Sequence, residues 1–243
     1  MSLPIRFPAT PMAWWNSFSH LLYPELCVAC GSSLPSSAQQ CFCFRCRTQI
    51  TLTGFHAEQN NELTERLWGR LHLETATALY YFVKKGPVQW ALHHLKYSNQ
   101  PEIGKRMGRL LGRELFKSPH YQQIDAIVPV PLHPAKERQR GYNQSMAFAL
   151  GLAESMQIPV LGNVLARRQF TESQTHKHRV ERFQSVGEVF VIDRPALVAG
   201  KHILLVDDVL TTGATLESCG NLILEQAGSL LSVATIAVAS YRS

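Results

Sequence analysis

One stretch of the sequence decides the fold: His202-Ile-Leu-Leu-Val-Asp-Asp-Val-Leu-Thr-Thr-Gly-Ala-Thr215. Its first five residues form a short, nearly all-apolar run, which is typical of a strand buried on both faces of a parallel sheet. We expect this strand to end at Val206 and a helix to occupy Gly213–Gln226 after a Thr- and Gly-rich turn. A strand, a turn and a helix in this order predict one unit of an α/β domain.

The same alternation continues on both sides of this stretch. Strands are expected at Thr75–Val83, Ile124–Val130, Val189–Ile192 and Leu230–Ala239, and helices at Val88–Tyr97, Glu102–Lys117 and Asn143–Met156. The sequence therefore predicts an α/β fold with a mostly parallel sheet and flanking helices. Apolar residues recur at helical spacing in the second helix and are expected to face the core: Ile103, Met107, Leu110, Leu111 and Leu115. In the third helix, one apolar face is expected to contain Met146, Leu150 and Ala153.

The turn after the apolar run predicts a site for a phosphorylated ribose. Ligands of open α/β sheets bind at the carboxyl ends of strands, where Asp207 and Asp208 lie. The following segment offers helix N-terminal N–H groups, hydroxyl donors and a glycine that lets the backbone approach a phosphate; it comprises Val209, Leu210, Thr211, Thr212, Gly213, Ala214 and Thr215. The two carboxylates repel a phosphate but accept hydrogen bonds from sugar hydroxyls, or hold Mg²⁺ through water. The alternative is an ordinary strand, turn and helix in which Thr and Asp serve as caps.

A second segment carries three cations after another predicted strand: Val128-Pro-Val-Pro-Leu-His-Pro-Ala-Lys-Glu-Arg-Gln-Arg-Gly-Tyr-Asn-Gln-Ser145. The prolines end strand pairing, and we expect a loop that contains Lys136, Arg138 and Arg140. Arginine forms forked hydrogen bonds with phosphate oxygens, so this loop suits a pyrophosphate group. The alternative is a charged loop that is merely solvated.

The stretch from His202 to Thr215 resembles the 5-phosphoribosyl-1-pyrophosphate (PRPP) motif of type I phosphoribosyltransferases. Nearly the whole chain resembles the ComF family. The second resemblance rests on Pro129-Val-Pro-Leu132, Arg138-Gln-Arg-Gly-Tyr-Asn-Gln144, Leu95-Lys96-Tyr97, Arg168, Thr171, Gln174 and Arg182, in the family's order. It implies that Asp207 and Asp208 contact the ribose hydroxyls and act as catalytic residues if the protein is an enzyme. Thr211 to Thr215 would bind the 5′-phosphate, with Mg²⁺ accompanying PRPP. One departure is Ser185, where the family pattern leads us to expect asparagine.

A cysteine cluster precedes the α/β region. Cys27-Val-Ala-Cys30 and Cys43-Phe-Arg-Cys46 are separated by twelve residues, a spacing that suits four thiolates around a structural Zn²⁺. Cys41 can replace Cys43 as a ligand or be a bystander, and a redox dithiol pair is the alternative to zinc. Cys219 falls on an apolar helix face, so we expect it to be buried. The ComF resemblance also implies an N-terminal zinc module.

Three regions follow from this pattern. We expect residues 1–52 to form an amphipathic lead-in and the zinc module, residues 53–74 a linker, and residues 75–243 the phosphoribosyltransferase-like domain. The polar composition of Gly54–Arg66 indicates a loose loop. No apolar run reaches 18 residues, so we expect no membrane span. The lead-in around Trp14, Trp15 and Phe18 lacks the pattern of a signal peptide, which favours a cytoplasmic location.

The charge balance favours partners that carry phosphate. The 24 Lys and Arg residues and 18 Asp and Glu residues give a formal net charge of +6. Lys105, Arg109, Arg113 and Lys117 would form a cationic line on one helix, and further cations lie at Arg167, Arg168, Lys177, Arg179 and Arg182. Such lines bind single-stranded nucleic acid or are simply solvated faces.

Two functional hypotheses remain. The first is a phosphoribosyltransferase, and the second is a module that binds PRPP, a nucleotide or single-stranded nucleic acid without turning the ligand over. The ComF resemblance implies a role in handling incoming single-stranded DNA during natural transformation, with a helicase-like ATPase as partner. Nothing in the sequence marks the pocket for an acceptor substrate.

Overall fold

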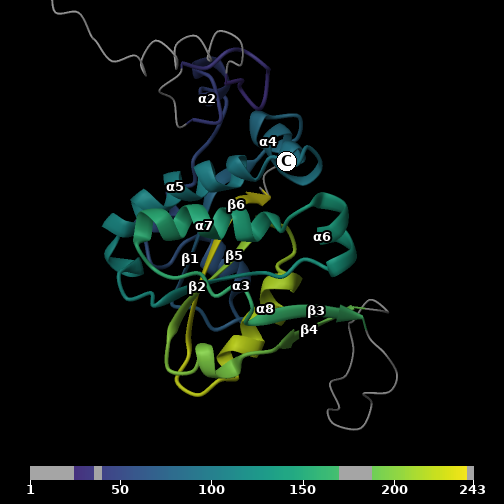
Figure 1. The fold of residues 1–243 in the computed structure, drawn as a ribbon. Coiled ribbons are helices and arrows are strands. Elements are labelled where there is room, and N and C mark those ends of the chain that lie inside the picture. Colours follow the sequence, from purple (N-terminus) through teal and green to yellow (C-terminus); the bar gives the residue numbers. More distant parts are fainter. Residues whose placement is uncertain (1–24, 36–39, 170–187, 240–243) are drawn as a thin grey trace, which may run out of the picture.

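A four-stranded parallel sheet forms the centre of the molecule in the computed structural model, which describes residues 25–35, 40–169 and 188–239 (Figure 1). Its strands are β1 (Thr75–Phe82), β2 (Ala126–Pro129), β5 (His202–Leu210) and β6 (Leu230–Ala239), in the spatial order β1-β6-β5-β2. The register pairs Val206 of β5 with Pro129 of β2 and Ala234 of β6. The prediction of an α/β fold with a parallel sheet is confirmed.

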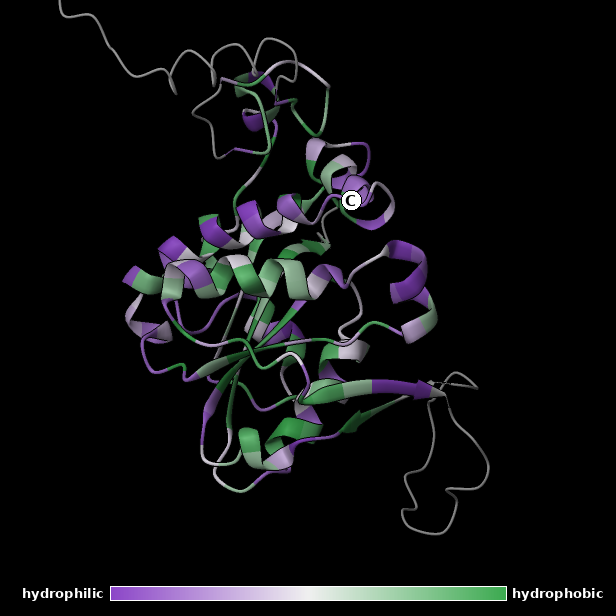
Figure 2. Cartoon of the chain, viewed as in Figure 1, coloured by the Kyte–Doolittle hydropathy of each residue, from purple (hydrophilic) through white to green (hydrophobic). Residues whose placement is uncertain are grey.

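Helices cover both faces of this sheet. On one face lie α4 (Pro87–Tyr97), α5 (Pro101–Lys117) and α7 (Gln144–Met156), whose apolar side chains share a core with Leu204 and Val206. On the other face α3 (Glu62–Leu67) and α8 (Ala214–Leu224) share a core with Ile203 and Leu205. This alternation along β5 is the period of two that a strand imposes. In Figure 2, apolar residues accordingly concentrate in the strands and the facing helix surfaces.

Two glycines set the close packing of α5 against α7. A side chain on Gly108 would collide with the carbonyl oxygen of Phe148, and one on Gly151 with that of Lys105. The predicted core residues of α5 are buried except Leu110, which is exposed. The predicted face of α7 is wrong at Leu150, which is exposed, because the buried side of this helix, which also packs against α5, includes Ala147, Phe148, Gly151 and Leu152.

The prediction of a loose loop at Gly54–Arg66 is wrong. This segment contains a 3₁₀ turn, η1 (Phe55–Ala57), and helix α3. Asn61 caps α3 in a capping box with Thr64, and Leu63 and Leu67 are fully buried. Polar residues that suggested a loop lie before this helix: Glu58, Gln59 and Asn60 are exposed between η1 and α3, and Asn61 is the buried cap. The division of the chain at residues 52 and 75 stays a prediction.

Two further elements were not predicted. Helix α6 (Pro134–Arg140) occupies the segment expected to be a loop; it begins at a proline and ends at Gly141 in the left-handed conformation. It buries no residue, so it lacks the apolar periodicity that would have revealed it. Strand β3 (Leu165–Gln169) pairs antiparallel with β4 (Glu188–Ile192), the strand that was expected at Val189–Ile192.

The remaining regular elements are short: α2 (Phe44–Arg47), η2 (Pro119–Tyr121) and η4 (Pro195–Leu197). Helix α8 begins one residue later than expected and ends at Leu224, and Gly228 lies in the turn beyond it. Several predictions fall outside the described residues: the lead-in with Trp14, Trp15 and Phe18, and the positions Thr171, Gln174, Lys177, Arg179, Arg182 and Ser185. Within the described part of the chain, no helix combines the length and apolar character that a membrane crossing requires.

Candidate functional site

The two acids Asp207 and Asp208 lie inside β5 rather than after it, because this strand continues to Leu210. The Ser145 hydroxyl at the start of α7 donates a 2.9 Å hydrogen bond to Asp207 Oδ1, and the Asp208 N–H donates to the same oxygen at 2.8 Å. Asp208 Oδ2 lies 2.8 Å from the Lys96 ammonium of α4. Residues from three elements therefore orient the two carboxylates before any ligand binds.

The acid pair is electrostatically costly. Burial, and secondly the neighbouring Asp208 carboxylate, raise the pKa of Asp207 to about 7, while hydrogen bonds and Lys96 act in the opposite direction. Near neutral pH the Asp207 carboxyl is therefore partly protonated. A ligand that brings hydroxyl donors or a cation to these oxygens favours the charged form. A ribose diol or Mg²⁺ meets this requirement.

The turn Thr211–Gly213 joins the acid pair to α8. Gly213 has φ of 82° and is the N-cap residue of this helix, so it requires a conformation that glycine adopts readily. Thr211 and Thr212 are exposed, and the N–H of Ala214 lies 3.5 Å from Thr212 Oγ1. Exposed hydroxyls at the N-terminus of a helix are suited to an anion.

Arg70 holds this turn through hydrogen bonds to Thr212 and Glu217. This role was not identified from the sequence. Its guanidinium donates to the Thr212 carbonyl oxygen at 2.6 Å and to Glu217 Oε2 through Nε at 3.0 Å. A Cβ on Gly213 would lie 2.9 Å from a methyl of Leu67. The segment expected to be a linker thus fixes the backbone of the predicted phosphate turn.

The second predicted segment, Val128–Ser145, contacts the acid pair through its last residue, Ser145. Asn143 donates a side-chain hydrogen bond to the Val130 carbonyl at 2.9 Å and accepts one from the Ser145 N–H at 3.0 Å. Ser145 in turn contacts Asp207, so the carboxyl ends of β2 and β5 are linked. Lys136 and Arg138 are exposed on α6, whereas the Arg140 guanidinium donates to Gln144 Oε1 at 2.8 Å.

The sequence did not reveal three residues that position the site: Lys96, Ser145 and Arg70. Lys96 and Ser145 stand within stretches that carried the family resemblance, but nothing there indicated contact with the acids. The bonds span 62 residues of sequence for Ser145–Asp207 and 147 for Arg70–Glu217. Such pairings depend on the assembled sheet and have no local pattern.

A group of four thiols forms a second site. The sulfur atoms of Cys27, Cys30, Cys43 and Cys46 all lie within 4.8 Å of one another. Four ligands at about 2.3 Å from one tetrahedral ion would be about 3.8 Å apart, so the group fits a metal ion such as zinc. The left-handed Gly31 closes the first turn, in which its N–H donates to the Cys27 carbonyl at 2.9 Å.

Two other cysteines lie outside this group. Cys41 is buried, and its thiol points to the Ile103 carbonyl oxygen at 3.8 Å. Burial raises the pKa of Cys41 to about 12, whereas the Ser32 hydrogen bonds lower the pKa of Cys30 to about 6. Cys41 is therefore a core residue in this arrangement and does not take the place of Cys43. The prediction that Cys219 is buried is confirmed.

Comparison with known proteins agrees with this arrangement. Residues 143–243 match the family described as "Phosphoribosyl transferase domain". "Competence protein F" of Haemophilus influenzae is 26% identical over 213 residues, which cover 84% of this chain and 86% of that protein. These relatives support the resemblance to the ComF family.

Other similarities to this chain cover less sequence. "DNA utilization protein YhgH" of Salmonella typhimurium is 31% identical over 150 residues, which cover 60% of the chain and 65% of that relative. The chain thus spans somewhat less than two thirds of the YhgH relatives it matches. "Competence protein ComFC" of Bacillus subtilis is 33% identical over 100 residues, covering 41% of the chain and 38% of the relative.

Solved structures similar to this chain include the adenine phosphoribosyltransferase of Saccharomyces cerevisiae. The TM-score is 0.39 at 18% identity, and the match covers 58% of this chain and 73% of the other.

Proposed function

We propose that this ComF-family protein binds PRPP with Mg²⁺ at the carboxyl ends of β5 and β2. The observation that carries the proposal is the acid pair Asp207–Asp208, held by Ser145 and Lys96 beside the N-terminus of α8. Burying two adjacent carboxylates destabilises a fold, so their retention beside an exposed anion-binding turn favours a ligand that carries both a diol and a phosphate.

The parts of PRPP then have separate partners. Asp207 and Asp208 accept hydrogen bonds from the ribose hydroxyls, and the turn Thr211–Thr215 binds the 5′-phosphate. The pyrophosphate is bound by the cations of α6, which are Lys136, Arg138 and Arg140. Mg²⁺, when bound, would supply positive charge that offsets the charge of the pyrophosphate.

Two modes of action fit this site. In the enzymatic mode, an acceptor nucleophile attacks the anomeric carbon, the bond from this carbon to the pyrophosphate oxygen breaks, and pyrophosphate leaves with the bonding electrons. The α6 cations stabilise the leaving group, while the acid pair orients the ribose. In the non-catalytic mode the same contacts bind PRPP or a nucleotide as a signal.

The biological role that we propose is the handling of incoming single-stranded DNA during natural transformation. The relatives named "Competence protein F" and "DNA utilization protein" support it. A helicase-like ATPase is the partner that this role implies, and the role places the protein in the cytoplasm. We propose zinc as the metal of the four-cysteine group, since four thiolates in tetrahedral spacing are typical of structural zinc.

Calorimetric titration tests the proposed ligand. PRPP with Mg²⁺ is added to the zinc-loaded protein, to the double variant Asp207→Ala, Asp208→Ala and to the control Asp193→Ala, whose exposed carboxylate pairs with Arg168. We expect micromolar binding in the wild type and the control and none in the double variant. If PRPP with Mg²⁺ does not bind to the folded wild-type protein, the proposal is wrong.

Release of pyrophosphate distinguishes the two modes. Wild-type protein is incubated with PRPP, Mg²⁺ and one candidate acceptor at a time, and pyrophosphate is measured. Release that depends on the acceptor and is lost in the double variant indicates a transferase. Tight PRPP binding without release across the acceptors indicates a sensor or a nucleic-acid-binding module.

A further inference from the structure

Helix α4 presents a line of aromatic rings to solvent. Trp90, His93 and Tyr97 form this line, which we call the aromatic stripe; Trp90 is 50% exposed and Tyr97 66%. The ring centroids are 6.4 Å apart for Trp90 and His93, and 4.8 Å for His93 and Tyr97. The stripe extends about 10 Å along the helix. Leu92 and Leu95 already provide the core contact of α4, so the stripe is not needed for packing.

Cations lie at both ends of the aromatic stripe. The described residues 25–35 and 40–50 contain the four-thiol group, and we call them the metal module because we propose that they bind zinc. At the Trp90 end, a hollow of about 360 Å³ separates α4 from the metal module, and Arg45 and Lys85 line it. No acidic side chain is among the described residues that line this hollow. At the other end, the Arg140 guanidinium lies over the Tyr97 ring, 5.6 Å from its centroid.

The aromatic stripe connects the two sites of the molecule. Figure 1 shows α4 between α2 of the metal module and α6. Phe44 of α2 adds an aromatic side chain that is 81% exposed. Tyr97 follows Lys96, the partner of Asp208, so the stripe ends one residue after the α4 residue that contacts the acid pair.

The cationic line predicted on α5 is less suited to binding nucleic acid. Arg109 contacts Glu154 at 2.5 Å and Glu102 at 2.9 Å, and Lys117 lies 3.5 Å from Glu114. Carboxylates of the protein thus already neutralise two of the four cations. Arg45 and Lys85 instead line a hollow with no carboxylate among its described residues, although Cys30 and Cys46 of the four-thiol group also line it.

We propose that the aromatic stripe is a stacking platform for unpaired bases of single-stranded nucleic acid, with the strand running from the metal module toward the acid pair. The choice of this partner rests on the proposed role in DNA handling. Bases stack on Trp90 and Tyr97, and phosphates approach Arg45, Lys85 and Arg140. Aromatic platforms beside cationic grooves are the means by which proteins bind single strands without sequence preference.

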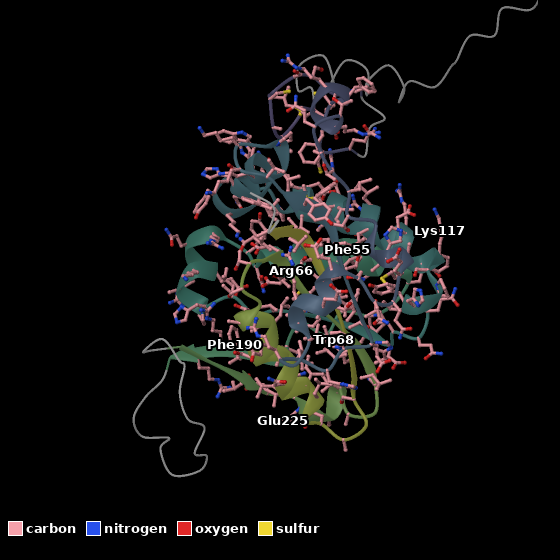
Figure 3. The ribbon with its side chains drawn as sticks, turned by 180° about the vertical axis from the view of Figure 1, so that it is seen from behind. Phe55, Arg66, Trp68, Lys117, Phe190 and Glu225 are labelled. Atoms are coloured by element: carbon pink, nitrogen blue, oxygen red, sulfur yellow. The ribbon has the colours of Figure 1, made fainter. Side chains whose placement is uncertain are left out.

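Fluorescence anisotropy with a labelled oligo(dT) tests the platform. We expect Trp90→Ala and Tyr97→Ala each to weaken binding on the order of tenfold, and Trp90→Phe to restore most of the affinity. Two controls are matched for exposure: Trp68→Ala (78% exposed) and Phe116→Ala (56%) should bind as the wild type does. Figure 3 labels Trp68, which lies well away from the metal module.

An abasic strand of equal length separates stacking from charge. We expect the abasic strand to bind the wild type about as weakly as oligo(dT) binds the double variant Trp90→Ala, Tyr97→Ala. Arg45→Ala and Lys85→Ala should instead lower the slope of affinity against salt, by about 0.7 for each phosphate that the variant no longer neutralises. Equal binding of abasic and normal strands, or wild-type affinity in Trp90→Ala and Tyr97→Ala, would overturn the proposal.

PRPP titration on the same proteins keeps this proposal distinct from the proposed ligand. Trp90→Ala should bind PRPP as the wild type does, which also shows that the variant is folded. If the wild type binds PRPP but no oligonucleotide, the platform is wrong and the PRPP site stands. If base-dependent binding occurs without PRPP binding, the platform stands and the PRPP site is wrong. Binding of a protein partner to the stripe, with no base dependence, also counts against the platform.

Discussion

The metal module and the acid-pair site reach an ordered arrangement by opposite routes. The four clustered cysteines lie within twenty residues of sequence, and tight local turns bring their sulfur atoms within 4.8 Å of one another. The acid pair is instead held by Ser145 and Lys96, which belong to helices far away in the sequence. The first site is encoded by spacing and the second by the fold of the whole sheet.

This difference implies a difference in what stabilises each region. The described part of the metal module contributes few apolar side chains to the core, so we expect the bound ion to supply most of its folding free energy. The acid pair lies in a scaffold whose strands are mostly buried, and it lowers the stability of that scaffold instead of raising it. Replacing one of the four cysteines should therefore unfold the metal module, whereas replacing Asp207 should stabilise the sheet region.

The largest effect is expected in the metal module. Cys27→Ser or Cys46→Ser should abolish metal binding, since zinc bound to four thiolates supplies on the order of 10 kcal/mol in small modules. Metal content by mass spectrometry and limited proteolysis of residues 25–50 measure the result. Cys41→Ser is the control and should keep a full metal content, because Cys41 lies outside the four-thiol group. A module that stays protected without metal would contradict this view of its stability.

The second effect has the opposite sign. Asp207→Asn should stabilise the protein at pH 8, because the pKa of Asp207 is raised from 3.8 to about 7 by burial and by Asp208. Such a rise means that ionising Asp207 costs the folded state, so stability falls as pH rises from about 4 through 7. At about 1.36 kcal/mol per pKa unit, the variant gains about 4 kcal/mol at pH 8.

Thermal unfolding without Mg²⁺ measures this gain at two pH values. We expect it to shrink by more than half at pH 5, where less of the penalty has developed. Asp193→Asn is the control, since Asp193 lies on the surface and pairs with Arg168. Equal melting temperatures for Asp207→Asn and wild type at pH 8 would show that the folded protein tolerates the charge, and the contrast with the metal module would weaken.

The third effect concerns the segment that was expected to be a linker. Asn61 caps α3 and its side-chain amide donates to the carbonyl oxygens of Phe55, Glu58 and Ala76, at 3.1, 3.1 and 2.9 Å. Asn61→Ala removes the cap and leaves buried carbonyls without a donor, so we expect a loss of about 2 to 3 kcal/mol by denaturant unfolding. Asn60→Ala, next to the cap and exposed, is the matched control. A loss below about 0.5 kcal/mol would mean that this segment is loosely attached.

These cases show why some of the molecule could be predicted from the sequence. The strands β1, β5 and β6 are long, apolar and bounded by turn residues. The spacing of the cysteine pairs is typical of four thiolates around one metal ion. Helix α3 escaped prediction because just Leu63 and Leu67 mark its buried side, a signal too short to separate from a polar loop. Strand β5 was predicted to stop at Val206, because two acids rarely continue a buried strand. Ser145 and Lys96 stabilise that exception, and no local pattern shows them.

The smallest effect tests whether the unpredicted segment serves the site. Arg70 donates to the Thr212 carbonyl and pairs with Glu217, so it links the end of α3 to the turn proposed to bind phosphate. Arg70→Ala should weaken PRPP binding about tenfold, or about 1.4 kcal/mol, because the turn must then be ordered by the ligand itself.

The comparison is with Arg194→Ala, an exposed arginine in the loop after β4, which should bind PRPP as the wild type does. Arg70→Lys should recover only part of the affinity, since an ammonium cannot reproduce the forked contact. Calorimetry decides between two views of the segment. Unchanged PRPP affinity in Arg70→Ala would make α3 and its extension a structural cover, whereas the expected loss makes it a part of the acid-pair site assembled from distant sequence.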